Sequence, residues 1–283
     1  MKVCWASFGI MLLAITLPRM ASAQLTLAAN NPIVYGHHHV VATDVDAHLK
    51  FWVDALGGTP VKVGVPTNVI RFPEVLVFLA NRKAVGGSEG TTVDHIGFAV
   101  ADVRATVAKL KAAGYPITTA KASPPEAKVQ GDVATIGKLV IAFVMGPDDT
   151  KVELVEDKTV TGPPVLHHIH FAGADPAQMR SWYVKTFDAK SISQGGYQMA
   201  GLPGVSLVFS KAAHPVTTTR EHALDHIGFE VRNLEEFCRK LEASGIKLDR
   251  PYTKVPALGI AVAFFTDPWG TYIELTEGLD KIR

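Results

Sequence analysis

The sequence predicts an α+β protein built from four βαβββ units. The motif Asp-His-Ile-Gly-Phe occurs twice, at residues 94–98 and 225–229, and the same offset of 131 residues separates His37 from His168, which each begin a strand-like run. Repetition at a fixed offset indicates that two related segments make up the chain. Within each half, 58 residues separate the two histidines, so each half contains two units; four units over residues 24–283 have about 65 residues each.

Each unit is expected to contain a strand, a helix and then several short strands. An Asp or Asn follows each leading histidine by seven residues, and because such side chains cap helix N-termini, helices are expected at 44–56, 102–113, 175–187 and 233–244. β-branched and aromatic runs bounded by Gly, Pro and Asp predict strands at 37–42, 69–72, 75–79, 139–144, 151–155, 168–172, 205–209, 260–265 and 272–276. The segment Thr-Gly-Pro-Pro at 161–164 is typical of a linker between the halves.

The first 23 residues are typical of a secretory signal peptide. Lys2 precedes an almost wholly apolar run at 8–17, and Ala21 and Ala23 supply small residues before a cleavage site at Gln24. The apolar run is shorter than the ~20 residues that span a bilayer, which argues against a membrane anchor. The sequence therefore predicts a signal peptide over 1–23 and an exported mature protein, periplasmic or secreted, that does not remain in the membrane.

The composition excludes some classes of protein. With 283 residues, of which 47% are hydrophobic and 19% charged, the chain can bury a large core. The 28 basic and 27 acidic residues nearly cancel without forming a basic stripe, so no nucleic-acid partner is expected. Cys4 lies in the signal segment, which leaves Cys238 unpaired. Its place on the apolar face of the expected helix 233–244 predicts a buried packing thiol.

A carboxylate stands among apolar neighbours in the last strand of each half, at Glu153 and Glu274. An inward-pointing carboxylate costs several kcal/mol unless a cation or a proton compensates it. Two imidazoles and one carboxylate leave open positions on a divalent metal, which is typical of a catalytic site, although purely structural histidines are the alternative. Each half would supply one such set: His37, His95 and Glu153 in the first half, and His168, His226 and Glu274 in the second.

Further histidines stand near these positions. His39 and His170 share a strand face with His37 and His168, because side chains alternate along a strand. We expect them to support the ligands or to face substrate rather than to bind metal. The other histidines lack this register and are expected at the surface: His48, His214 and His222.

These residues resemble the vicinal oxygen chelate superfamily, which includes glyoxalase I, bleomycin resistance proteins and type I extradiol dioxygenases. The six residues of the two sets match the ligand positions of that family, and Asp-Pro-Trp-Gly at 267–270 resembles its turn motif, with a weaker copy at 146–149. The resemblance covers nearly the whole mature chain. It implies two domains, over 33–158 and 165–278, each a pair of βαβββ units curled into a half-barrel around a metal.

Two departures from the relatives bear on the reaction. Glyoxalase I has a further glutamate on the fourth strand, where this chain has only apolar residues around Phe78. Extradiol enzymes have His and Tyr upstream of the turn motif, but residues 249–266 contain no histidine and Phe264 stands at the expected place of the tyrosine. Each departure removes a group that would handle protons or oxygen.

The resemblance implies a divalent-metal-dependent enzyme that acts on a small vicinal-oxygen substrate, as a dioxygenase or as a glyoxalase-like lyase or isomerase, and the signal-peptide pattern predicts that it is exported. The metal would be Fe, Mn, Zn or Ni. The alternative is a non-catalytic protein that sequesters a small ligand, although core packing is favoured for the candidate pocket aromatics Phe51, Trp52, Trp182, Tyr183 and Phe265. If only one half is active, its better turn motif favours the C-terminal half.

Overall fold

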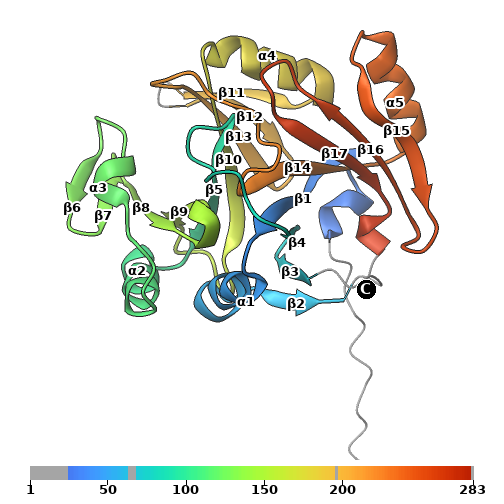
Figure 1. Ribbon diagram of the computed structural model, residues 1–283. Helices are drawn as coiled ribbons and strands as arrows, with labels where there is room; N and C mark the ends of the chain where they lie inside the picture. Colours follow the sequence, from blue (N-terminus) through green and yellow to red (C-terminus); the bar gives the residue numbers. More distant parts are fainter. Residues whose placement is uncertain (1–24, 63–67, 195–196, 282–283) are drawn as a thin grey trace, which may run out of the picture.

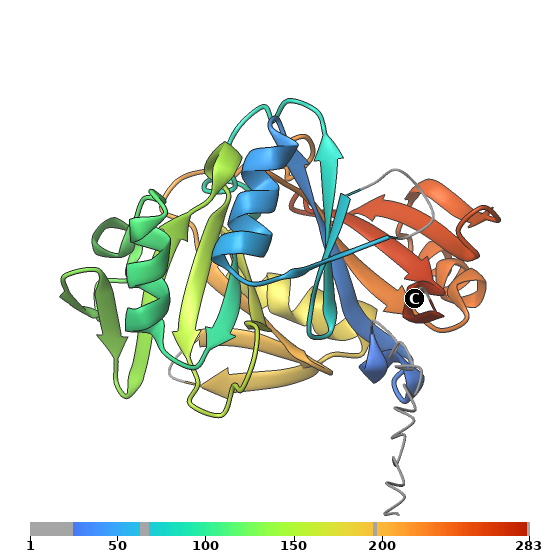
Figure 2. The same ribbon diagram turned by 90° about the horizontal axis from the view of Figure 1, so that it is seen from below.

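A computed structural model describes residues 25–62, 68–194 and 197–281, which form two twisted sheets covered by helices (Figures 1 and 2). The predicted signal peptide lies outside these residues and stays a prediction. Within the described ranges, no helix is long and apolar enough to cross a membrane.

Each sheet is built around two long central strands. The eight-stranded sheet has the order β15 (Leu248–Val255), β16 (Ile260–Thr266), β17 (Tyr272–Glu277), β14 (Leu224–Val231), β1 (Ile33–Ala42), β4 (Val75–Asn81), β3 (Asn68–Phe72) and β2 (Thr59–Val61). The nine-stranded sheet has the order β11 (Lys190–Gln194), β12 (Tyr197–Leu202), β13 (Val205–Lys211), β10 (Val165–Gly173), β5 (Val93–Val100), β9 (Lys151–Glu156), β8 (Leu139–Met145), β7 (Val133–Ile136) and β6 (Lys128–Gln130). Four βαβββ units are thus present, as predicted, and the second has one additional short strand, β6.

The helices follow the leading strand of each unit. They are α1 (Val45–Leu49) with the π-helix η2 (Lys50–Ala55), α2 (Val103–Ala112), α4 (Pro176–Phe187) and α5 (Leu234–Ala243). Shorter helices are α3 (Thr119–Ala122) and the 3-10 turns η1 (Thr26–Ala29), η3 (Pro147–Asp149) and η4 (Leu279–Lys281).

The units pair across the two halves of the sequence, which corrects the expected pairing within each half. Strand β1 pairs antiparallel with β14, and β10 pairs antiparallel with β5. Unit 1 therefore shares a sheet with unit 4, and unit 2 shares one with unit 3. The repeat could not reveal this, because β5 and β14 have nearly the same sequence, so that β1 could pair with either of them.

Three of the four predicted helix caps are confirmed. Asp44, Asp102 and Asp175 each accept a hydrogen bond from the backbone N–H three residues later, at 3.1, 2.9 and 3.0 Å. Asn233 is not such a cap, because it has φ +58° and its side chain makes no capping bond. The N–H of Leu234 donates instead to the Glu277 carboxylate.

The core between sheets and helices contains the aromatic residues considered for a pocket. Trp182 packs against the main hydrophobic cluster, and the other four are buried within it: Phe51, Trp52, Tyr183 and Phe265. The predicted core packing is thus confirmed. Cys238 is buried and free, as predicted.

The surface prediction for His48 is wrong. His48 is fully buried, with Nε2 3.0 Å from Asp148 and with Nδ1 accepting a bond from the Trp52 indole. The face of α1 that carries it packs against η3, so this histidine ties two elements together.

Candidate metal centres

Two clusters of metal-binding residue types lie on the sheets. Site I consists of His37 and His39 from β1, His226 from β14 and Glu274 from β17, and its ligand atoms lie within 4.8 Å of one another. One oxygen of Glu274 is the centre of the cluster. It lies 2.9 Å from His37 Nε2, 3.0 Å from His226 Nε2 and 3.5 Å from His39 Nε2.

Site II is the counterpart on the nine-stranded sheet. It consists of His95 from β5, Glu153 from β9, and His168 and His170 from β10. One oxygen of Glu153 lies 2.9 Å from His95 Nε2 and 3.1 Å from His168 Nε2, and the two imidazole nitrogens are 3.4 Å apart. The ring of His170 stacks on that of His95, with the centroids 4.4 Å apart.

All six residues predicted from the sequence lie in these clusters, but their grouping by half is wrong. Glu153 meets His168 rather than His37, and Glu274 meets His37 rather than His168. The reason is the pairing of β1 with β14 and of β10 with β5, which places residues of both halves in each site. The question of which half is active therefore becomes a question of which site is active.

His39 and His170, expected beside the ligands, belong to the clusters themselves. The signal in the sequence was that both residues share a strand face with the predicted ligands. In the structure, strand pairing places His39 opposite His226 and His170 opposite His95. Whether any of these residues binds metal remains a prediction.

The glycine of the repeated motif makes room for a histidine ring. Gly97 lies opposite His168 and Gly228 opposite His37. A Cβ atom at either glycine would lie 2.1 Å from the Cε1 atom of the facing histidine, which no real contact allows. The motif therefore requires glycine because a histidine ring from the partner strand occupies the space of its side chain.

The donor atoms fit a divalent metal. A metal–ligand distance of about 2.1 Å sets neighbouring donors about 3.0 Å apart in an octahedron and about 3.4 Å apart in a tetrahedron. The shorter separations between donor atoms, from 2.9 to 3.5 Å, span these values, and all donor atoms of a cluster lie within 4.8 Å of one another. Imidazole and carboxylate suit Fe, Mn, Zn or Ni.

Electrostatics keep four of the eight donors in the forms that a metal needs. Burial opposes the charge on both glutamates, but the surrounding histidines hold the pKa of Glu153 and Glu274 well below the usual range. Burial lowers the pKa of His39 and His170 well below the usual value, so both rings are neutral at pH 7. Deprotonated donors are what metal binding requires. At His95 and His226 burial opposes the charge, but hydrogen bonds to the neighbouring carboxylates raise the pKa of both imidazoles, so a metal would have to displace a proton from these two rings.

A carboxylate stands behind one histidine of each site. Asp94 lies 2.7 Å from His95 Nδ1, and Asp225 lies 2.7 Å from His226 Nδ1. Such a partner fixes the proton on Nδ1 and leaves Nε2 free to face a metal. The sequence signal was the aspartate that precedes the histidine in the motif. Each aspartate is itself held by a cation at 2.7 Å, Lys151 at site II and Arg82 at site I.

The two sites differ in what contacts Nδ1 of the second histidine, which is His168 in site II and His37 in site I. His168 Nδ1 lies 2.8 Å from His167 Nδ1. His37 Nδ1 is buried without a hydrogen-bond partner among the residues that the structure describes. His167 has Gly36 as its counterpart in unit 1, which offers no side chain.

The place of the fourth-strand glutamate of glyoxalase I is apolar in both sites. Phe78 on β4 stacks on His39 with centroids 4.6 Å apart, and Val208 on β13 pairs with His170. Phe264, at the expected place of the extradiol tyrosine, contacts His226 edge to face at 5.7 Å. Neither position supplies a proton-transfer group.

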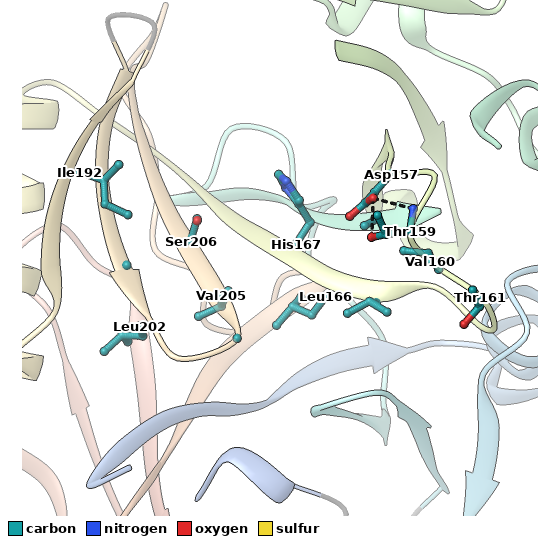
Figure 3. Close-up of a pocket in the computed structure, with 14 residues that line it drawn as sticks. Asp157, Thr159, Val160, Thr161, Leu166, His167, Ile192, Leu202, Val205 and Ser206 are labelled. Carbon is teal, nitrogen blue, oxygen red and sulfur yellow. Dashed lines mark hydrogen bonds between the residues drawn. The ribbon is translucent and has the colours of Figure 1, made fainter. Parts of the chain in front are cut away.

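A pocket of about 580 Å³ lies beside site II (Figure 3). His167 and Ser206 form the part of its wall nearest the cluster, because His167 hydrogen-bonds to His168 and Ser206 pairs with His168. Ala99 on β5 and Asp157 in the loop after β9 also line the pocket. Site II therefore has a neighbouring space that a small molecule can enter.

Comparisons with known proteins agree with this architecture. The family model of the Glyoxalase/Bleomycin resistance protein/Dioxygenase superfamily matches residues 34–154 and 165–275. A lactoylglutathione lyase of Haemophilus influenzae is 29% identical over 130 residues, which are 41% of this chain and 87% of that protein. The crystal structure of glyoxalase I from Zea mays superposes with a TM-score of 0.69 at 19% identity, over 88% of this chain and 94% of that chain. The chain belongs to the Glyoxalase/Bleomycin resistance protein/Dioxygenase superfamily.

Proposed function

We propose that this protein is an exported, divalent-metal-dependent lyase or isomerase that acts on a small substrate with adjacent oxygen atoms. The observation that carries the proposal is the shared carboxylate oxygen in each site, which lies about 3 Å from two imidazole nitrogens. The relatives named lactoylglutathione lyase and glyoxalase I support the lyase class.

When bound, the metal would polarise a substrate carbonyl oxygen as a Lewis acid. The chain's own residues would hold it: two histidines and the glutamate of each site would be the ligands, and Asp94 and Asp225 fix the tautomer of one of these histidines in each site. Because each site draws its ligands from two units, the pairing of the central strands is what assembles the centre.

The reaction needs a side chain that transfers a proton, and this chain has no counterpart of the fourth-strand glutamate of glyoxalase I for that role. In site II the neutral His170 is placed to take this role, because it lies in the cluster and its Nε2 is 2.9 Å from the Ser210 hydroxyl, which orients the ring. In this proposal His170 would accept the proton from the hydroxyl-bearing carbon of the substrate and return it to the adjacent carbonyl carbon, while the hydroxyl proton passes to the former carbonyl oxygen.

The metal content of the exported protein, purified without a polyhistidine tag, tests the proposal. We expect close to two metals per chain by inductively coupled plasma mass spectrometry, and the loss of one in each of Glu153→Gln and Glu274→Gln. His214→Ala, which changes an exposed histidine outside both clusters, should keep two. Full metal content in the Glu153→Gln/Glu274→Gln double variant would refute the assignment.

The reaction class is tested with the metal-loaded protein on 1,2-dicarbonyl and α-hydroxycarbonyl compounds, with and without added thiols. A lyase or isomerase converts substrate without consuming oxygen, whereas oxygen uptake would identify a dioxygenase. Tight ligand binding that survives removal of the metal, without turnover, would identify a sequestering protein.

A further inference from the structure

The two sites have unequal surroundings although their ligands are alike. At site II the strand next to the ligand strand carries Ser206 opposite His168, and Ser206 lines the pocket of about 580 Å³. At site I the corresponding residue is Leu76, opposite His37. Leu76 is fully buried. The same strand position is thus an open pocket wall in one site and packed interior in the other.

The N-terminal segment fills the space at site I. Leu25 is 1% exposed and packs in one cluster with Leu76, Phe78 and Leu279. Phe78 in turn contacts the rings of His37 and His39, so this packing reaches the ligands. Figure 2 shows η1 beside the start of β1, where it covers this end of the sheet.

Hydrogen bonds hold the segment in place. The Leu27 N–H donates to the Glu74 carboxylate at 3.1 Å, and the Thr26 hydroxyl bonds to the same group. Arg232 donates to the carbonyl of Ala29 at 2.8 Å. These contacts make Leu25–Ala29 a fixed closure rather than a loose end.

The repeated motif carries a matching difference. Residues 94–100 and 225–231 are identical except at the sixth position, which is Ala99 in one and Glu230 in the other. Ala99 lines the pocket beside site II. Glu230 is buried at site I, where its carboxylate accepts bonds from the Thr276 hydroxyl and the Gly278 N–H, both at 2.6 Å. A small residue keeps the pocket of site II open, and a large one occupies its counterpart.

What remains of the counterpart space is smaller. It is a hollow of about 350 Å³ beside the N-terminal segment, and charged side chains line much of it: Glu230, Arg232, Glu277, Asp280 and Lys281. Ala28 and Ala29 of the segment also line this hollow, whereas Leu25 packs with Leu76.

The lining of the larger pocket indicates its ligand class. Ala99, Leu166, Leu202 and Val205 supply apolar surface, and the hydroxyls of Thr159, Thr161 and Ser206 supply hydrogen bonds. Asp157 is its carboxylate, and none of its fourteen lining residues, all in the described part of the chain, is Lys or Arg. An anionic group there would meet a carboxylate without a compensating cation.

We propose that substrate enters site II alone, that the pocket beside it takes the non-chelating part of the substrate as an uncharged or cationic, partly apolar group, and that Leu25–Ala29 keep site I closed. The chelating role of site II rests on the proposed function. The accessibility of the pocket and its charge preference do not depend on a metal.

Cysteine accessibility tests the pocket without a metal. In a chain with Cys4→Ser and Cys238→Ala, Ser206→Cys is compared with its counterpart Leu76→Cys, using methanethiosulfonate reagents with neutral, cationic and anionic tails. We expect Ser206→Cys to react at least tenfold faster than Leu76→Cys, and to react faster with the cationic than with the anionic reagent. Val205→Cys and Val75→Cys, which precede Ser206 and Leu76 on the same two strands, form a second pair in case Leu76→Cys does not fold, because Val205 lines the pocket and Val75 is fully buried. Equal rates within the pairs, or a faster anionic reagent, would overturn the proposal.

A chelator titration tests which site receives a ligand. Benzohydroxamic acid, a neutral vicinal-oxygen chelator, is titrated calorimetrically into the Co²⁺-loaded protein. We expect one equivalent per chain, an affinity at least tenfold lower in Ser206→Leu, and weaker binding of the 4-carboxy analogue. Ser181→Leu, the same change on the exposed face of α4, should bind as wild type.

Two bound equivalents would refute the closure of site I, and unchanged affinity in Ser206→Leu would refute the role of the pocket. Failure to bind Co²⁺ at all would instead refute the proposed function, and the cysteine experiment would still decide whether the pocket is open.

Discussion

Replacing Gly97 by alanine is expected to disable site II through a residue that is not itself a ligand. The new Cβ would lie 2.1 Å from Cε1 and 2.2 Å from Nδ1 of His168. Since ordinary contacts begin near 3.4 Å, the imidazole must retreat by about 1.3 Å. Metal ligands tolerate errors of only about 0.2 Å, so His168 is lost from the metal-binding set.

The expected result for Gly97→Ala is one metal per chain in place of two, with an affinity loss of at least about 100-fold at site II. Overpacking should also reduce the free energy of unfolding by about 1–3 kcal/mol. Competition with a chromophoric chelator measures the affinity, and urea unfolding measures the stability.

Gly162→Ala is the matched control, because nothing lies within 4 Å of the Cβ position at Gly162. Gly228→Ala should have the same effect on site I, through His37. Two metals bound to Gly97→Ala with wild-type affinity would refute the argument that this glycine exists to admit the ring.

Three further predictions concern the supports of the sites and the fold. Asp94→Asn and Asp225→Asn should each lower the metal affinity of one site by about 10–100-fold while the far-ultraviolet circular dichroism is unchanged, and equal affinity to wild type would exclude the tautomer-fixing role. Burial raises the pKa of Glu230 to about 7, so the folded state binds its proton more tightly than the unfolded chain does. The free energy of unfolding should therefore fall as the pH rises from about 4.5 to 7, by on the order of 3 kcal/mol from this group, and Glu230→Gln should remove that slope in urea titrations at a series of pH values. Asp175→Ala should cost about 1 kcal/mol through loss of its cap, whereas Asn233→Gly should cost nothing, because φ at Asn233 is already +58° and its side chain caps nothing; thermal unfolding of the two variants decides.

The sequence was sufficient for the identity of the candidate ligands, because the repeat offset aligned His37 with His168 and Glu153 lay in an apolar strand. It was not sufficient for their grouping. Strand pairing is non-local, and the strands at 93–100 and 224–231 have nearly the same sequence, so only the fold selects which of them pairs with β1. Gly97 held the missing information, since a glycine in mid-strand marks a close approach by another chain segment.

Errors at single residues had local causes. His48 lacked the register of the ligands, but the loop that brings Asp148 to it lies a hundred residues away and could not be inferred from its neighbours. Asn233 has the right side chain for a cap, yet a positive φ turns it away from the first turn of α5. In both cases tertiary contacts override a sound local pattern.

The assembly of each site from both halves has a consequence for how such a chain could arise. A half-length chain with the same units would hold no complete site alone, and would need to meet a second copy across a two-fold axis. The Haemophilus relative, of which 130 residues are 87%, has about that length. Symmetry would force two copies to have identical sites. Joining the copies in one chain lifts that constraint, so that a mutation such as the one distinguishing Ala99 from Glu230 changes one centre and leaves its twin as it was.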